Sequence, residues 1–199
     1  MTQSCVSDGS CVPILCSVIA LSLCVTIVEC GVAAQPESLK TVAAFDVPIH
    51  SEAERDEFVE VLRAAAKEEV GLQVDATSLE ELASLAKVDP NTARTVSAGV
   101  WRGSNDQEPI ADAMDWPDHP GEVWITFARG QDIALSNRFR EHLMRRIQQR
   151  WPGTLPLPII ESRSIPLFRD LVKTPTGYVL NPTAAARYAH PQEDRRQAR

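Results

Sequence analysis

The chain has 199 residues, of which 44% are hydrophobic and 24% are charged, which is typical of one globular domain and excludes a disordered or fibrous protein. Its formal net charge of −7 argues against general nucleic-acid binding. All 5 cysteines fall within the first thirty residues. We therefore expect a leading segment and a body that needs no disulfide and has no nucleophilic cysteine.

The leading segment is uncharged from residue 9 to residue 28. Its dense apolar part, residues 14–28, has the length of a signal-peptide core, whereas a spanning helix needs about 20 apolar residues. The small residues at 32–34 fit a secretory cleavage pattern. No basic residue precedes Lys40, so a normal signal start is missing and neither membrane orientation is favoured. The sequence predicts a cleaved export signal or a retained membrane anchor in residues 1–34.

Charge is distributed unevenly along the chain. Residues 1–128 hold 7 basic and 21 acidic side chains, whereas residues 129–199 hold 13 basic and 6 acidic ones. This split indicates either a basic surface for an acidic protein or lipid, or two halves of one fold that pack against each other. The basic half lacks interleaved aromatic residues suited to base stacking, so we expect no nucleic-acid partner.

The first half of the body predicts two strands and two helices in alternation. Residues 42–47 form a short apolar strand, and residues 72–76 alternate apolar and polar side chains, as a half-buried strand does. The helices are expected over residues 51–71 and 78–89. Each opens with a serine followed three residues later by a glutamate, which is the pattern of a capping box.

The second half predicts three more strands and one long helix. Residues 95–101 and 122–129 alternate as strands, and residues 102–121 between them are polar and interrupted by prolines, which indicates a long loop. An amphipathic helix rich in arginine follows over residues 138–151. Residues 155–159 alternate but contain two prolines, so this strand should lie at a sheet edge.

The chain is expected to end with a small hairpin over residues 171–180, a short helix to about residue 188 and a charged tail. The predicted domains are the leader 1–34, a single α+β domain 35–190 and the tail 191–199.

The order of the predicted elements matches a ferredoxin-like α+β sandwich, with two β-α-β units, an antiparallel sheet and two main helices on one face. The C-terminal hairpin and short helix add to this plan. If this arrangement holds, the acidic first helix and the basic last long helix lie side by side.

The expected loop 102–121 contains the densest set of functional candidates, which are Asp112, Asp115, Trp116, Asp118 and His119. Carboxylates with a histidine could bind a divalent cation, but Pro117 and Pro120 interrupt the alternate ligand spacing of a calcium loop. A solvated acidic loop with Trp116 as a hydrophobic plug is the simpler interpretation, and partner recognition is a third one. We expect no bound metal.

Trp101 and Trp124 lie on strands that are expected to face each other across a hairpin. They could form an exposed aromatic binding pair, or they could cover one face of the sheet against the terminal hairpin. The binding candidates are therefore Asp115, Trp116, Asp118, His119, Trp101 and Trp124.

No catalytic residues and no cofactor are expected. There is no Gly-x-Ser-x-Gly elbow and no glycine-rich phosphate loop, and the 4 histidines stand singly. The sequence favours a small non-catalytic binding protein of a bacterial-type envelope, periplasmic or secreted or anchored in the inner membrane, whose partner is another protein. Membrane contact would come from residues 1–34. The alternative is a small metal-dependent hydrolase that uses the segment from Asp112 to His119.

Overall fold

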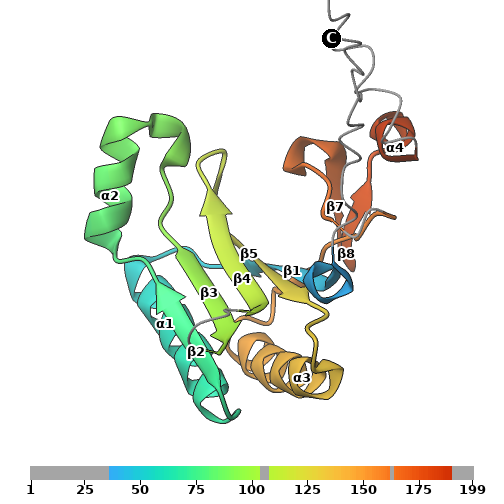
Figure 1. The fold of residues 1–199 in the computed structure, drawn as a ribbon. Coiled ribbons are helices and arrows are strands. Elements are labelled where there is room, and N and C mark those ends of the chain that lie inside the picture. Colours follow the sequence, from blue (N-terminus) through green and yellow to red (C-terminus); the bar gives the residue numbers. More distant parts are fainter. Residues whose placement is uncertain (1–35, 104–107, 162–163, 190–199) are drawn as a thin grey trace, which may run out of the picture. The chain divides into compact units, whose positions relative to one another are not determined.

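Six strands form one sheet in the computed structural model, which describes residues 36–103, 108–161 and 164–189 (Figure 1). The strand order is β2-β3-β4-β5-β1-β6, and all neighbouring strands are antiparallel. In chain order the strands are β1 (Thr41–Pro48), β2 (Leu72–Ala76), β3 (Ser97–Arg102), β4 (Glu108–Trp116), β5 (His119–Ala128) and β6 (Leu155–Pro156). The α+β class expected from the sequence is confirmed.

The described helices differ in length and in place. The long ones, α1 (Glu52–Lys67) and α3 (Ile133–Arg150), cover the same face of the sheet (Figure 1). The short ones are α2 (Leu79–Val88) and α4 (Pro182–Ala189). Single turns of 3-10 helix are η1 (Glu37–Leu39), η2 (Pro90–Thr92) and η3 (Phe168–Asp170). A separate hairpin is formed by β7 (Leu171–Thr174) and β8 (Gly177–Leu180).

The two predicted helix starts are formed by side-chain caps. At α2 the Ser78 hydroxyl accepts from the Glu81 N–H at 3.3 Å, and the Glu81 carboxylate accepts from the Ser78 N–H at 3.0 Å, which is a complete capping box. At α1 the Ser51 hydroxyl accepts from the Glu54 N–H at 3.2 Å, while the Glu54 carboxylate accepts from the His50 N–H at 2.8 Å. Both caps satisfy backbone donors that a helix start leaves without partners.

The main core lies between the sheet and the two long helices. Alternate residues of the strands and every third or fourth residue of each helix point into it, as the periods of strand and helix require. The ring of Phe127 on β5 contacts that of Phe139 on α3 at 6.4 Å, and Phe58 on α1 contacts Trp151 at 5.8 Å. Its largest fully buried side chains include Phe58, Phe127, Phe139, Ile125, Leu143 and Ile147.

Helices α1 and α3 lie side by side, as expected, and ion pairs join them. The pairs are Arg138 with Glu69, Arg146 with Glu68 and Arg150 with Glu57. Pairs with exposed partners contribute little stability, typically about 0–1 kcal/mol each. The pairs with Glu68 and Glu69, which directly follow α1, and the pair with Glu57 place acidic residues against the basic helix α3, and this contact accounts for part of the uneven charge distribution.

The expected loop 102–121 is wrong, because its second half forms β4, which joins β5 through a tight turn at residues 117–118. Alanines and Asp115 face the main core side of β4, whereas Asp112, Met114 and Trp116 face the other side. Aspartate and alanine have weak intrinsic strand preference, so the pattern predicts a loop. Pairing with β3 on one side and β5 on the other supplies the backbone hydrogen bonds that make it a strand.

The specific ferredoxin-like arrangement is not confirmed. Because β4 is inserted, β3, β4 and β5 separate β1 from β2, and the first β-α-β unit spans almost the whole sheet. The proline-containing strand at 155–159 does lie at a sheet edge, but only Leu155 and Pro156 pair with β1.

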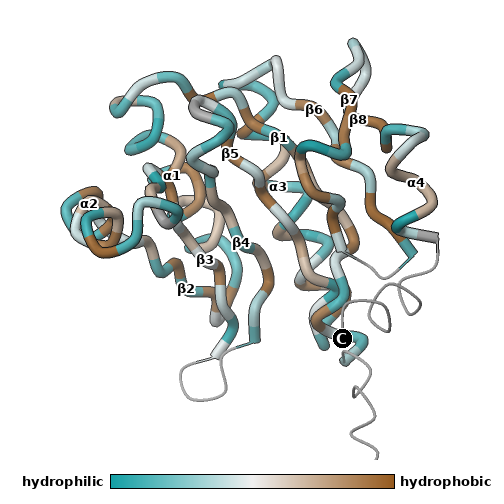
Figure 2. Tube along the Cα trace, turned by 90° about the horizontal axis from the view of Figure 1, so that it is seen from above, coloured by the Kyte–Doolittle hydropathy of each residue, from teal (hydrophilic) through white to brown (hydrophobic). Residues whose placement is uncertain are grey.

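The face of the sheet opposite α1 and α3 carries a second apolar cluster. Its buried members are Ala44, Trp124, Leu157 and Tyr178, and Phe168 and Leu171 pack against it. Figure 2 shows the hairpin β7–β8 and α4 on the side of β1 and β6, with α2 at the opposite margin. The C-terminal hairpin thus covers part of this second face.

A buried network holds the hairpin to the sheet. Asp46 on β1 is 1% exposed, and its Oδ2 accepts from the Tyr178 hydroxyl at 2.8 Å. The same hydroxyl lies 3.2 Å from Glu122 Oε2, and Lys173 Nζ lies 2.6 Å from Glu122 Oε1 and 3.4 Å from Asp46 Oδ2. Two strands of the sheet therefore bind both strands of the hairpin through one set of charged groups.

The predicted leader and tail lie outside the described residues. The described residues all belong to one compact unit, Ala34–Arg199. Within the described ranges no helix has both the length and the hydropathy that crossing a bilayer requires.

Candidate functional site

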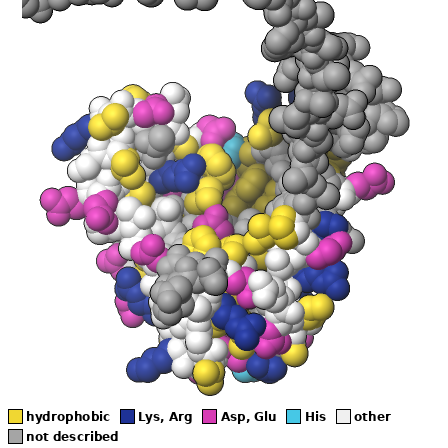
Figure 3. Space-filling model, viewed as in Figure 1, with side chains coloured by type: hydrophobic (Ala, Val, Ile, Leu, Met, Phe, Trp, Pro, Cys, Tyr) yellow, Lys and Arg dark blue, Asp and Glu magenta, His cyan; other side chains and the backbone are white. Residues whose placement is uncertain are grey.

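A cleft opens on the second face of the sheet, between strands β4 and β5 and the segment that precedes β7. Its volume is ≈ 560 Å³, which is within the range of small ligand sites. Figure 3 shows hydrophobic side chains lining a hollow in this part of the molecule. We call it the aromatic cleft; it is lined by Asp112, Met114, Trp116, Asp118, His119, Trp124, Thr126, Ile165, Pro166, Leu167, Phe168 and Arg169.

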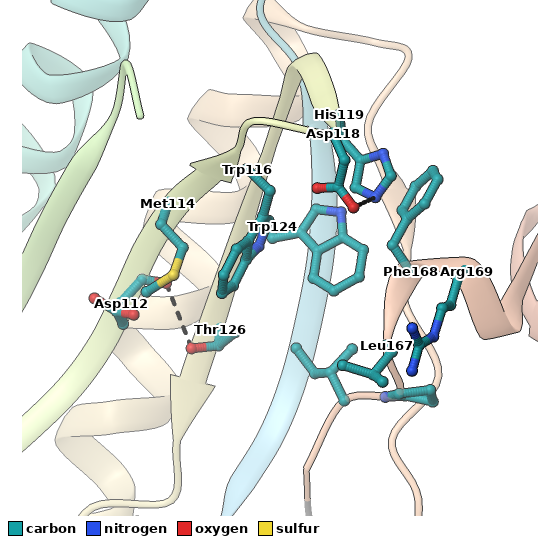
Figure 4. A pocket seen from close by; sticks show the side chains of 12 residues that line it. Asp112, Met114, Trp116, Asp118, His119, Trp124, Thr126, Leu167, Phe168 and Arg169 are labelled. Carbon is teal, nitrogen blue, oxygen red and sulfur yellow. Dashed lines mark hydrogen bonds and ion pairs between the residues drawn. The ribbon is translucent and has the colours of Figure 1, made fainter. Parts of the chain in front are cut away.

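One wall of the aromatic cleft is the sheet itself. Because strand side chains alternate between faces, Asp112, Met114 and Trp116 project from β4 to the same side. On β5, Trp124 is the register partner of Met114, and Thr126 is that of Asp112. Figure 4 shows Asp112 and Thr126 towards one end of the cleft, with the β4–β5 turn residues at the other.

The opposite wall is the segment around η3. The Phe168 ring lies 5.9 Å from the Trp124 ring and also packs against the His119 ring (Figure 4). The segment is anchored behind the cleft by Asp170, which accepts from Arg187 at 2.7 Å and from the Tyr188 hydroxyl at 2.6 Å. Burying this carboxylate with two strong donors fixes the position of the wall.

His119 lies at the turn end of the cleft, with its Nε2 atom 3.4 Å from Asp118 Oδ2. Burial lowers the pKa of His119 below its ordinary value, although the charges of Asp118 and Glu122 act in the other direction. The imidazole is therefore neutral at neutral pH. Its Nε2 is buried and has no hydrogen-bond partner among the described residues.

Asp112 is the half-buried acid of the cleft. Burial raises the pKa of its carboxyl above the ordinary value, and the positive charge of Arg94 only partly offsets this effect. Within the described part of the chain, the Asp112 carboxylate makes no ion pair. Thr126 donates to the Asp112 backbone carbonyl at 3.4 Å and not to its side chain.

Trp116 lies at the rim, where it is 36% exposed. The guanidinium carbon of Arg94 lies 4.6 Å from the centre of its ring, which is a cation–π contact. The exposed Trp116 therefore already holds a cation of its own chain on one side and borders the aromatic cleft on the other.

Asp115 does not line the cleft. It is buried on the other face of β4, where its Oδ1 accepts from the N–H groups of Thr95 and Val96, each at 2.8 Å, and its Oδ2 accepts from the Thr95 hydroxyl. Both carboxylate oxygens are therefore occupied by the chain that leads into β3. Its position indicates a structural role.

Trp101 and Trp124 do not face each other, because β4 lies between their strands; the expected direct pairing of those strands is wrong. Trp124 is 7% exposed and covers the sheet face beneath the hairpin segment, the second of the two sequence interpretations. Trp101 lies over Gly99, where a Cβ would come 2.5 Å from its Nε1. Gly99 is the register partner of Asp112, so this indole lies over the strand position next to Asp112.

Phe168 and its apolar neighbours were not among the sequence candidates. The signal available in the sequence is the run Ile165-Pro166-Leu167-Phe168, an apolar stretch without regular periodicity. Such a run does not reveal which surface it contacts. Only the docking of the hairpin brings it opposite Trp124.

The described residues contain no group of three or more His, Cys, Asp or Glu side chains placed to hold a metal ion. Of the five candidates in the expected loop, Asp112, Trp116, Asp118 and His119 line the same cleft, and Asp118 Oδ2 lies 3.4 Å from His119 Nε2. Comparison of the chain with protein-family models, with curated proteins and with solved structures finds no match.

Proposed function

We propose that this chain is a small, non-catalytic binding protein of a bacterial-type envelope, and that the aromatic cleft is where it binds a partner protein. The observation that carries the proposal is the cleft itself. It joins the aromatic side chains of Trp116, Trp124 and Phe168 to a half-buried carboxylate on a sheet, and aromatic side chains are common anchors of protein interfaces.

Residues 1–34 support the envelope location. Their apolar core and small-residue site favour export by a cleaved signal or retention by an anchor, with the body in the periplasm, secreted, or held at the inner membrane. Measuring the mass of the native N terminus and the cell fraction that holds the protein tests this part. Recovery of the full chain from the cytosol, with Met1 still present, would refute it.

The alternative of a metal-dependent hydrolase has less support. It would use the segment from Asp112 to His119, but Asp115 faces away from the cleft and both of its oxygens already accept hydrogen bonds. The neutral His119 and the exposed Asp118 would have to suffice with Asp112. Addition of zinc, magnesium or calcium should then raise the thermal midpoint, since a ligand that binds only the folded state stabilises it.

A matched pair of variants tests the cleft as the binding surface. Leu167 lines the cleft and is 55% exposed, whereas Val179 on β8 is 49% exposed and does not line it. We expect Leu167→Glu to abolish capture of a partner by the tagged full-length chain and Val179→Glu to leave it unchanged. Both sites are exposed, so the thermal midpoint should stay the same in both variants.

Equal capture by the two variants would remove the cleft from the interface. Loss of capture in both would place the interface on the hairpin surface instead. A catalytic turnover that depends on the cleft residues would contradict the non-catalytic assignment.

A further inference from the structure

The Asp112 carboxylate lines the aromatic cleft and accepts a hydrogen bond from the backbone N–H of Ala113, but within the described residues it has no ion-pair partner. It is half buried on β4, and burying a charge without a paired donor is unfavourable. Among the described side chains none forms an ion pair with it, and the Thr126 hydroxyl in the facing strand is directed to its backbone oxygen. An entering group that carries N–H donors and a positive charge would supply the ion pair that this carboxylate does not have.

The surroundings of this carboxylate suit a cation. Trp101 lies over Gly99, the β3 register partner of Asp112, and Trp124 stands one register pair away on β5. Aromatic faces attract ammonium and guanidinium groups, by about 0.5–1 kcal/mol when exposed and about 2 kcal/mol when desolvated. A carboxylate in a cleft that Trp116 and Trp124 also line therefore favours a positively charged group over a neutral one of the same size.

The contact of Arg94 shows that the Trp116 ring accepts a guanidinium. Its carbon lies 4.6 Å from the Trp116 ring centre, yet it does not form an ion pair with Asp112 within the described residues. Its Nε is buried and has no hydrogen-bond partner there. The Trp116 ring at the rim thus binds a guanidinium from outside the cleft lining, and this guanidinium forms no ion pair with the carboxylate inside the cleft.

The other charges of the cleft are of both signs, and the positive one, on Arg169, lies on the wall opposite the sheet. Asp118 adds a second negative charge at the turn end, His119 is neutral, and Arg169 is exposed on the η3 wall. A free ammonium ion would fill little of a ≈ 560 Å³ cleft whose opposite wall is largely apolar. A basic side chain flanked by apolar residues would contact both walls.

Building on the proposed function, we propose that the partner protein inserts a lysine or arginine flanked by apolar residues into the aromatic cleft, with Asp112 as its counter-charge. Trp124 and Phe168 then pack on the aliphatic stem of that side chain. The segment of the partner is recognised by this basic anchor, and acidic or neutral residues at the same place are disfavoured.

Three blocked pentapeptides, acetyl-Gly-Leu-Xaa-Leu-Gly-amide with lysine, leucine or glutamate as Xaa, test the inference against the full-length protein. Binding is followed by tryptophan fluorescence, because Trp116 and Trp124 line the cleft, and by calorimetry. We expect the lysine peptide to bind about tenfold more tightly than the leucine peptide, and the glutamate peptide to bind least.

The variant Asp112→Asn should remove the preference for lysine and leave leucine binding unchanged. Asp75→Asn, at an exposed position of β2, is the matched control and should keep the preference. Removal of the Asp112 charge should not lower the thermal midpoint, so a loss of binding cannot be ascribed to unfolding.

Each other result is informative. Equal or tighter binding of the leucine peptide would overturn the basic anchor while leaving the cleft as an apolar binding surface. Tightest binding of the glutamate peptide would assign selectivity to Arg169. Free butylamine binding as tightly as the lysine peptide would make the cleft a small-cation site. Failure of every probe would overturn the inference, while the Leu167→Glu capture test would still decide the proposed function.

Discussion

Replacing Tyr178 by phenylalanine isolates the bond that ties the C-terminal hairpin to the sheet. The hydroxyl donates to Asp46 Oδ2 at 2.8 Å and lies 3.2 Å from Glu122 Oε2, while the ring would be retained. Asp46 is 1% exposed and would be left with Lys173 at 3.4 Å. Since a hydrogen bond to a charged group contributes about 1.5–3 kcal/mol, we expect the free energy of unfolding to fall by about 2 kcal/mol at pH 7.

The fall in the free energy of unfolding caused by Tyr178→Phe should depend on pH, and the structure predicts the direction of this dependence. Burial raises the pKa of Asp46 above 3.8, although the bond from Tyr178 holds it down in part. The folded state therefore binds the proton more tightly than the unfolded state, and stability increases as the pH falls through the raised folded-state pKa. Without the hydroxyl the pKa of Asp46 rises further. The deficit of Tyr178→Phe is therefore largest when Asp46 is ionised and shrinks as it becomes protonated.

Urea unfolding between pH 8 and pH 4, followed by tryptophan fluorescence, measures both effects. Thr126→Val removes a hydroxyl whose bond is 3.4 Å long, and we expect it to cost less than about 0.5 kcal/mol at every pH. A Tyr178→Phe deficit as small as that control, or one that does not change with pH, would refute the assignment of Asp46 as the group that the hydroxyl stabilises.

Three further substitutions test the fold by the same urea assay. Asp115→Ala leaves two backbone amides and a hydroxyl without their acceptor and should cost about 3 kcal/mol, so a loss below about 1 kcal/mol would contradict its structural role. Gly99→Ala places a Cβ 2.5 Å from Trp101 Nε1 and should cost about 1–2 kcal/mol with a shifted emission maximum; an unchanged spectrum would show that the indole does not lie there. Arg150→Ala breaks its exposed pair with Glu57 and should cost less than about 0.5 kcal/mol, and a larger loss would mean that the α1–α3 contact depends on this charge.

Local sequence patterns were sufficient to predict an element wherever the hydrogen bonds of its backbone are made within that element. The capping residues Ser51 and Ser78 mark helix starts because their hydroxyls bond within one turn. The arginine-rich face of α3 and the acidic end of α1 were readable from composition, and their side-by-side packing followed from the expected two helices on one face. The terminal hairpin was readable because its turn chemistry is local.

Strand β4 could not be predicted from its local sequence pattern. Its residues alternate between faces, but small and acidic side chains carry little strand preference, so only the neighbouring strands stabilise the extended backbone. Missing β4 placed Trp101 and Trp124 on paired strands and allowed the ferredoxin-like arrangement.

The sequence by itself determined the fold class, most helix and strand positions and the opposite charges of the two long helices, because these depend on neighbours within a few residues. The tertiary structure alone decided the strand order, the structural role of Asp115 and the aromatic cleft. These depend on contacts between β4, β5 and the segment around Phe168, which are distant in the chain, and side-chain periodicity records only which face a residue occupies and not which segment will cover it.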